Sequence, residues 1–159
     1  MNIDIRDYQP VDTQYIASLF VDTIRNINIR DYAPEQINAW IYGVENWDLT
    51  RWQRSFLNKM VFVAEENTQI IGFGELENNG HIDRFYVHKD YIGQGVGSQI
   101  YRAIEAKAIA LGIEKLCVEA SLTAKSFFEK IGFHLVRKQT VVRNEVELIN
   151  FVMIKDLKF

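Results

Sequence analysis

The sequence has little cysteine, little proline and no long apolar run, and each shortage excludes a class of protein. Cys117 is the one cysteine and has no partner for an internal disulfide, which predicts a cytoplasmic chain. Two prolines and nine glycines in 159 residues exclude a collagenous or low-complexity chain. The apolar runs are too short for a membrane span, and the polar first ten residues do not resemble a signal peptide.

The charge is not of one sign either. Eighteen Lys and Arg residues face 21 Asp and Glu residues, and the net charge of -3 is spread along the chain. Without a basic stripe we expect no nucleic-acid partner, whereas a mildly acidic surface is compatible with an amine substrate. Hydrophobic residues make up 48% of the chain, enough for one sizeable core. We therefore expect a single domain over residues 1–159.

The apolar periodicity predicts a mixed α/β domain. A short strand around Ile3 and Ile5 precedes three helices, which begin near Pro10, Pro34 and Asp48. A three-stranded meander follows, and then strand, helix, strand, helix and a final hairpin. The predicted strands cover residues 61–65, 69–77, 81–88, 115–120, 134–142 and 147–154, and the later helices cover 97–111 and 123–131.

Three glycines at alternate positions stand between the strand ending at His88 and the amphipathic helix that follows. Gly93, Gly95 and Gly97 permit a backbone that turns its N–H groups inward, next to the positive end of a helix dipole. Such a loop can hold a pyrophosphate. The spacing differs from the dinucleotide-binding fingerprint, and a tight turn that binds nothing is the alternative.

Two segments resemble the signatures of the GNAT superfamily of N-acetyltransferases. Residues 87–98 resemble its acetyl-CoA loop, Val-x-Pro-x-Tyr-Arg-Gly-x-Gly-x-Gly, and residues 121–133 resemble its second signature, Asn-x-x-Ala-x-x-x-Tyr-Glu-Lys-x-Gly-Phe. Their order and spacing agree over nearly the whole chain. The resemblance implies a splayed, mostly antiparallel seven-stranded sheet flanked by helices. It also implies acetyl-CoA as co-substrate, held where the strand ending at Val87 and the strand ending near Ala120 diverge.

By the same resemblance, strand residues would flank the pantetheine arm and loop amides would hold the pyrophosphate. The cofactor-binding residues carried over by position are Phe85, Tyr86, Val87, Gly93, Gln94, Gly95, Val96, Gly97, Ser98, Ser121 and Phe128. Three positions depart from the family pattern. Ile92 replaces an Arg or Gln, Ser121 replaces the Asn, and Phe128 replaces a tyrosine that in many members protonates the leaving thiolate. Phenylalanine has no proton to give, so another acid or water must serve.

Acetylation of an amine needs a proton acceptor and a donor for the developing oxyanion. We expect the N–H of Val87 as the donor and Asp83, Glu75 or His81 as the base, with Glu119 a weaker candidate. Ideal strand alternation would put His81, Asp83, Phe85 and Val87 on one face, although a bulge would change this. Each candidate is otherwise an ordinary sheet or surface residue.

The acceptor side is less specific. Tyr32 and Trp40 lie in the helical region that covers the acceptor in the resembling family, and they are either a substrate wall or core. The histidines and the cysteine have no metal-ligand spacing, so we expect no metal, and Cys117 reads as a packing residue. Ile149, Phe151 and Met153 make a homodimer conceivable. We expect direct transfer from acetyl-CoA to a primary amine; the alternatives are a CoA-binding module with little turnover and a non-catalytic α/β interaction domain.

Overall fold

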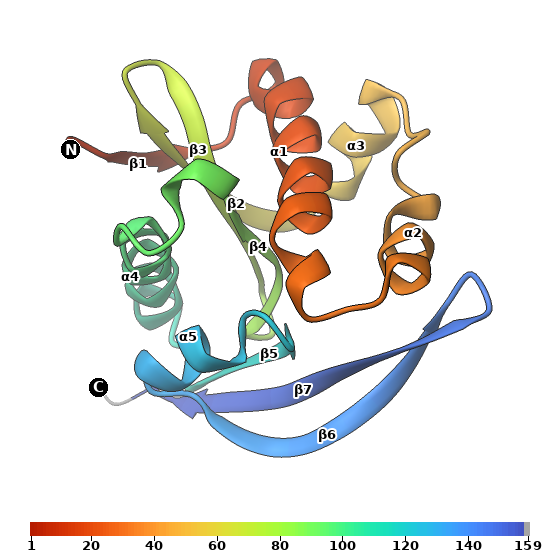
Figure 1. The fold of residues 1–159 in the computed structure, drawn as a ribbon. Helices are drawn as coiled ribbons and strands as arrows, with labels where there is room; N and C mark the ends of the chain where they lie inside the picture. The colour runs from red at the N-terminus through yellow and green to blue at the C-terminus, as the bar shows by residue number, and fades with distance from the viewer. Residues whose placement is uncertain (158–159) are drawn as a thin grey trace.

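A seven-stranded sheet in the order β1-β2-β3-β4-β5-β7-β6 runs through the molecule, whose computed structural model describes residues 1–157 (Figure 1). Every neighbouring pair is antiparallel except β4 and β5, which are parallel. The strands are β1 (Asp4–Asp7), β2 (Lys59–Glu66), β3 (Gln69–Glu77), β4 (His81–Val87), β5 (Lys115–Ser121), β6 (His134–Arg143) and β7 (Val146–Asp156).

Helices cover both faces of this sheet. On one face lie α1 (Thr13–Asn26), α2 (Pro34–Tyr42) and α3 (Leu49–Ser55), and on the other lie α4 (Val96–Ala110) and α5 (Lys125–Lys130). Local chemistry sets the helix starts: Pro34 is the first residue of α2, and the carboxylate of Asp48 accepts the N–H of Arg51 at 2.8 Å to begin α3. The sheet therefore separates two cores, one beneath α1–α3 and one beneath α4 and α5.

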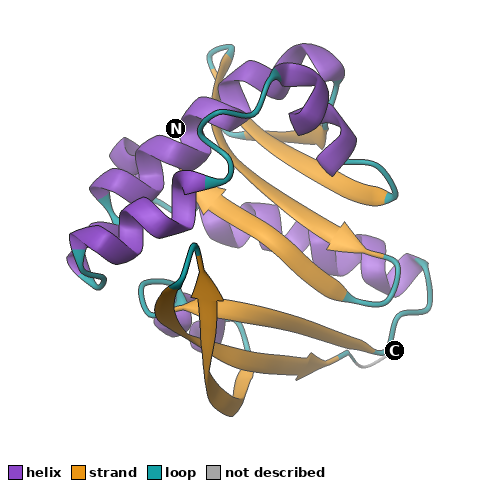
Figure 2. Ribbon diagram, turned by 90° about the vertical axis from the view of Figure 1, so that its right-hand side faces the viewer, coloured by secondary structure: helices purple, strands orange, loops and turns teal. Residues whose placement is uncertain are grey.

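The sheet is split between β4 and β5. Only His81 with Cys117 and Ile82 with Val118 are paired across this junction. Beyond these residues β4 and β5 continue without pairing with each other. Figure 2 shows the two halves of the sheet diverging from this point. The predicted splayed, seven-stranded α/β sheet is confirmed.

A β-bulge interrupts β4 next to the split. Gly74 and Leu76 of β3 pair with Phe85 and Ile82, so three residue steps on β4 oppose two on β3. As a result Ile82 and Phe85 pack in the same core, although they are an odd number of residues apart. The expectation that Asp83 shares a face with Phe85 and Val87 is therefore wrong, because the extra residue reverses the alternation.

The predicted strands and helices agree with the observed ones to within about two residues at most ends. Leu111, the residue after the end of α4, is 50% exposed. Met153 is fully buried, so it offers no surface to a second copy. No helix in residues 1–157 is long and apolar enough to cross a membrane.

Candidate functional site

A cavity of about 710 Å³ fills the gap where β4 and β5 diverge. The splayed ends of β4 and β5, the glycine loop and α5 line it, together with parts of α1, α2 and the β6–β7 hairpin. All the residues predicted to bind cofactor or acceptor line this cavity except Gln94, whose side chain is bonded to the carbonyl of Asp90 within the loop. Of the predicted bases, Asp83 and His81 line it and Glu75 does not.

The glycine loop forms a cradle of backbone amides at one end of the cavity. Gly93 and Gly95 have φ of +78° and +86°, which L side chains rarely adopt, and a Cβ at either would meet no atom within 4 Å. Gly95 caps α4, and the first N–H groups of a helix have no carbonyl partner within it. Open space, free amides and a helix dipole are the features that a pyrophosphate requires, so the geometry of the loop fits the predicted ligand.

Gly97 has a different role from the other two glycines. A Cβ there would come within 3.0 Å of the Phe127 ring, so glycine allows α5 to pack close to the start of α4. Phe127 also contacts Phe85, with ring centroids 5.4 Å apart. The loop is thereby held against the strand that borders the cavity.

The edge of β4 presents free backbone groups to the gap. The N–H of His88 donates to Ile71 at 2.8 Å, so by the alternation of an antiparallel ladder Val87 and Phe85 point their N–H and C=O groups away from β3. The carbonyl of Val87 accepts a hydrogen bond from the hydroxyl of Thr23 at 3.0 Å, and Thr23 is a buried residue of α1. The amides of Phe85 and Val87 remain directed at the gap. No sequence signal pointed to Thr23, because the contact spans 64 residues.

Phe128 and Ser121, which depart from the family signatures, are tied into the scaffold. Phe128 is only 2% exposed and packs against Phe85, Phe127 and Phe133. Ser121 accepts the N–H of Ala124 on its hydroxyl at 3.0 Å, which shapes the turn into α5. Neither residue supplies an acid to the cavity.

His81 stands at the floor of the split between two carboxylates. Its Nε2 is 2.5 Å from Glu119, which lines the cavity, and its Nδ1 is hydrogen bonded to Glu77. The hydrogen bond with Glu119, assisted by Glu77, raises the pKa of His81 to about 9 against the lowering effect of burial. An imidazolium with both N–H groups committed does not accept a proton, so His81 is unsuited to the role of base at neutral pH.

Asp83 presents a carboxylate to the cavity with one oxygen engaged. Its Oδ2 accepts from the ammonium of Lys59 at 2.6 Å, and its side chain is 39% exposed. Burial raises the pKa of Asp83, but the bond to Lys59 and its charge outweigh burial and leave the pKa below the ordinary value. Asp83 is thus ionised at neutral pH.

Glu75 lies behind this wall in the core. It is fully buried and forms ion pairs with Lys59 and Arg84. Burial raises the pKa of Glu75 above its ordinary value, and the charge of Arg84 offsets only part of that rise. With no access to the cavity, Glu75 has a structural position instead of the predicted catalytic one.

An aromatic wall closes the side of the cavity that was predicted to hold the acceptor. Tyr32 packs edge-on against Trp40, with centroids 5.3 Å apart, and Tyr86 packs edge-on against Phe20 at 4.9 Å. The hydroxyl of Tyr32 donates to the carbonyl of Ile149 at 2.7 Å and accepts the N–H of Leu122 at 2.9 Å. Tyr32 therefore ties the segment before α2 to the β5–β7 half of the split sheet, and it lines the cavity.

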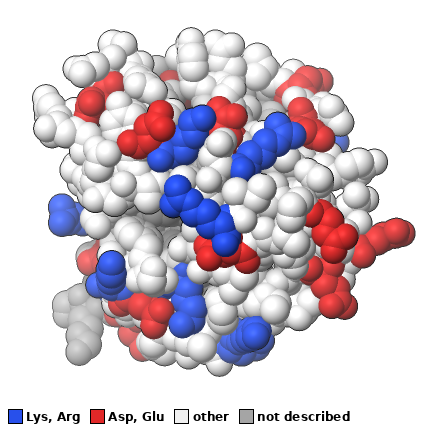
Figure 3. Space-filling model, viewed as in Figure 1, with Lys and Arg blue, Asp and Glu red and all other residues white. Residues whose placement is uncertain are grey.

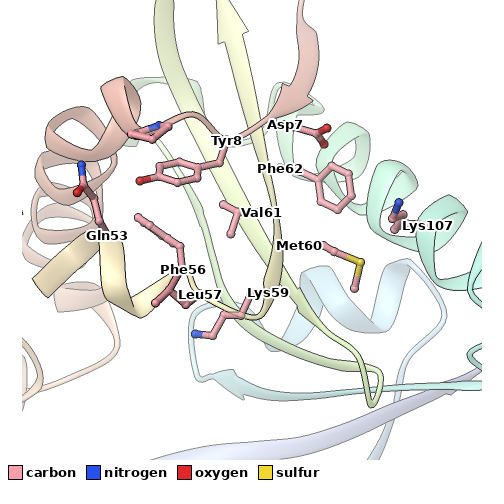
Figure 4. A pocket seen from close by; sticks show the side chains of 11 residues that line it. Asp7, Tyr8, Gln53, Phe56, Leu57, Lys59, Met60, Val61, Phe62 and Lys107 are labelled. Atoms are coloured by element: carbon pink, nitrogen blue, oxygen red, sulfur yellow. The ribbon is translucent and has the colours of Figure 1, made fainter. Parts of the chain in front are cut away.

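A smaller cavity of about 410 Å³ lies between α3, α4 and the start of β2, with mostly apolar walls and the lysines Lys59 and Lys107 (Figure 4). Acidic and basic side chains alternate over the face seen in Figure 3, without a field of one sign. No cluster of three or more potential metal ligands occurs among the residues described.

Comparison with known proteins gives a consistent family. Residues 28–155 match the acetyltransferase (GNAT) domain model. Over 153 residues the chain is 35% identical to an uncharacterized N-acetyltransferase, YafP, of Escherichia coli strain K12, and the match covers 96% of this chain and 95% of that one.

Solved structures show the same fold. A GCN5-related N-acetyltransferase from Rhodopseudomonas palustris superposes with a TM-score of 0.92 at 33% identity, covering 99% of this chain and 97% of that one. The PaiA N-acetyltransferase of Thermoplasma acidophilum, solved in complex with coenzyme A, gives a TM-score of 0.78 at 22% identity over 99% of this chain and 100% of that one. At that identity the second likeness concerns the fold alone.

Proposed function

Because this chain belongs to the GNAT acetyltransferase family, we propose that it transfers an acetyl group from acetyl-CoA directly to a primary amine. The observation that carries the proposal is the single cavity that joins the glycine loop, the free amides of β4 and the carboxylate of Asp83. A CoA-binding module would need the first two features only. An acetyltransferase also needs a proton acceptor, and the ionised carboxylate of Asp83 lies where β4 and β5 diverge.

Each part of the cavity has a task in this reaction. Acetyl-CoA supplies the activated acetyl thioester when bound. The loop amides bind its pyrophosphate, and the N–H of Phe85 or Val87 donates to the carbonyl oxygen as negative charge develops there. Asp83 accepts, directly or through one water, the proton that the attacking amine loses.

The proton for the departing thiolate comes from water in this proposal. Phe128 has no hydroxyl, and His81 has both ring N–H groups committed to Glu77 and Glu119. A thiolate leaves readily enough to be protonated after departure, so no dedicated acid is needed. The proposal thus accommodates the departure from the family signature.

The charges that line the cavity also bear on the acceptor. Asp83 and Glu119 are both paired with a cation, whereas Lys130 and Arg143 line the same cavity without an ion pair to any residue in 1–157. A cavity with unpaired cations and an aromatic wall disfavours an acceptor with several positive charges. We therefore propose a monoamine with an apolar body.

The first experiment is thermal unfolding with and without saturating acetyl-CoA, followed by an assay for released thiol with a panel of amines. A ligand that binds only the folded chain must raise the melting temperature. Gly95→Trp should remove the rise, because Gly95 lies in the cradle at a left-handed φ, whereas Gly43→Trp, at an unstrained glycine with open space, should keep it.

The outcomes separate the candidate functions. A rise with amine-dependent thiol release supports the acetyltransferase. A rise without thiol release for any amine favours a CoA-binding module. An unchanged melting temperature in the parent chain would contradict both the acetyltransferase and the CoA-binding module.

A further inference from the structure

Four charged side chains from three neighbouring strands meet behind the β4 bulge. Lys59 begins β2, Glu75 lies on β3, and Asp83 and Arg84 are the bulged residues of β4. The ammonium of Lys59 is 3.0 Å from Oε1 of Glu75 and 2.6 Å from Oδ2 of Asp83. Lys59 is therefore a bridge between a carboxylate in the core and one at the cavity.

Arg84 makes its hydrogen bonds with groups other than Asp83. Its Nε and Nη2 both donate to Glu75, and Nη2 also donates to the hydroxyl of Ser55 on α3 at 2.8 Å. Its guanidinium stands over the rings of Trp52 and Phe56, at 4.9 and 5.1 Å from their centroids. Among the described residues this leaves Lys59 as the cation that pairs with Asp83.

The other oxygen of Asp83 is available to the cavity. Oδ1 accepts no hydrogen bond from any residue in the described part of the chain, while Oδ2 is held by Lys59. One fixed oxygen and one open oxygen define the direction in which the carboxylate can take a proton. The side chain of Lys59 is 15% exposed, and Lys59 is not one of the residues that line the larger cavity.

We propose that Lys59, anchored by the buried carboxylate of Glu75, is a positioning residue that fixes the β4 bulge and holds Asp83 ionised with one oxygen directed at the acceptor. The catalytic part of this inference rests on the proposed function. The geometric part does not: it concerns where Asp83 points and which charge it carries. Lys59 acts through Asp83 and touches no reacting atom.

Other charges face Asp83 and must be counted in any pH dependence. Arg84 and His81 on its own strand act in the same direction as Lys59, whereas Glu75 on β3 and Glu119 on β5 oppose it. All of these remain when Lys59 is replaced. Since Lys59 alone is hydrogen bonded to Asp83, its removal should change the titration of Asp83 most.

The test compares Lys59→Met and Lys59→Arg with the parent chain. With an amine that is acetylated, Lys59→Met should lower kcat by about 10- to 100-fold, because misplacing a reacting group by 1 Å costs about 10²-fold. KM for acetyl-CoA should stay within twofold, and the acid limb of the kcat/KM profile should move to higher pH. Lys59→Arg, which keeps the cation, should restore most of kcat and the acid limb.

Lys107→Met is the matched control. Lys107, on α4, lines the same smaller cavity as Lys59 (Figure 4), yet it has no ion pair with a described residue. It should keep the parent values of kcat and the acid limb. Thermal unfolding of every variant, with and without acetyl-CoA, checks that each chain is folded and binds.

The outcomes remain decisive even if no amine is acetylated. In that case the carboxyl of Asp83 is titrated by carbon NMR in the full chain: a higher midpoint in Lys59→Met than in the parent and in Lys107→Met supports the pairing. An equal midpoint overturns it, whatever the protein catalyses. With turnover, a Lys59→Met variant whose kcat and acid limb match the parent overturns the proposal while the acetyltransferase function stands.

Discussion

Two carboxylates at the floor of the cavity differ in the cation that each one meets. Asp83 pairs with the ammonium of Lys59, which comes from outside the cavity, whereas Glu119 pairs with His81, which lines it. Glu119 is thus bound to a charge that shares its site, and its pKa is lowered mainly by that bond. Asp83 keeps an open oxygen and is the better proton acceptor of the two.

Replacing Asp83 should separate catalysis from binding. We expect Asp83→Asn to lower kcat by about 10²-fold or more, since a positioned general base contributes about 10²- to 10⁴-fold. The loop is untouched, so KM for acetyl-CoA and the rise in melting temperature should persist. Steady-state thiol release measures both, with Asp4→Asn, an exposed carboxylate at the sheet edge, as control. Parent-like kcat in Asp83→Asn would assign the base elsewhere.

His81 gives stability a dependence on pH. Its folded pKa of about 9 lies above the ordinary 6.5, so its stabilisation is complete below pH 6.5 and disappears as the pH rises through about 9. After allowance for solvent screening we expect a loss on the order of 1–2 kcal/mol in the free energy of unfolding. Urea unfolding at pH 6.5 and 9.5 measures it. His81→Gln should flatten the dependence, and an equally steep loss in that variant would contradict the assignment.

At the scale of elements, one buried ion cluster joins three strands and a helix. Glu75 of β3 has no exposed surface and is compensated by Lys59 of β2 and Arg84 of β4, while Arg84 reaches Ser55 of α3. Burying a charge is costly unless it is paired. Removing one member of the cluster therefore leaves a buried charge on the others without full compensation. The cluster therefore makes the local arrangement of these elements interdependent.

Glu75→Ala should be among the most destabilising single changes in the chain. It leaves Arg84 without its carboxylate partner and Lys59 with Asp83 alone, both largely shielded from solvent, for which we expect a loss of about 3–5 kcal/mol in the free energy of unfolding. Urea unfolding at pH 7 measures the difference. Glu114→Ala, at an exposed carboxylate before β5, should stay within about 0.5 kcal/mol of the parent. A loss below about 1 kcal/mol for Glu75→Ala would show that this part of the core tolerates Arg84 without its carboxylate partner.

The elements were predictable from sequence because their signals are local. Apolar spacing identified α1 and α4, and residues such as Pro34 and Asp48 marked where helices begin. The role of Glu75 was not predictable, because strand alternation does not reveal which carboxylate meets a cation from a distant strand. The bulge misled the placement of Asp83 for a related reason: one extra residue leaves no mark in the pattern.

At the scale of the whole molecule, the site is assembled from both halves of the split sheet. The glycine motif predicted the cofactor side, since it lies in one continuous segment. The side of the cavity predicted to hold the acceptor draws on α1 and α2 near the start of the chain and on the β6–β7 hairpin near its end, so only Tyr32 and Trp40 were anticipated. Residues such as Asn28, Gln139 and Arg143 carried no signal of their own.

The balance of charge over the cavity predicts a preference among acceptors. We expect kcat/KM for 2-phenylethylamine to exceed that for spermidine by about tenfold or more, because a second and third positive charge would face Lys130 and Arg143 without a free carboxylate. Initial rates of thiol release at matched amine concentrations measure the ratio. Arg143→Gln should narrow it, and a higher value for spermidine would reject the monoamine class.

The short seam between β4 and β5 also has a consequence for how the chain folds. Strands β1 to β4 and strands β5 to β7 are each joined to neighbours within their own stretch of sequence, and the strand pairing between the two groups is limited to two residue pairs of β4 and β5. Contacts that are near in sequence form early, because little loop entropy is lost in closing them. We therefore expect two nascent units that dock late along the seam, leaving open between them the cavity where β4 and β5 diverge.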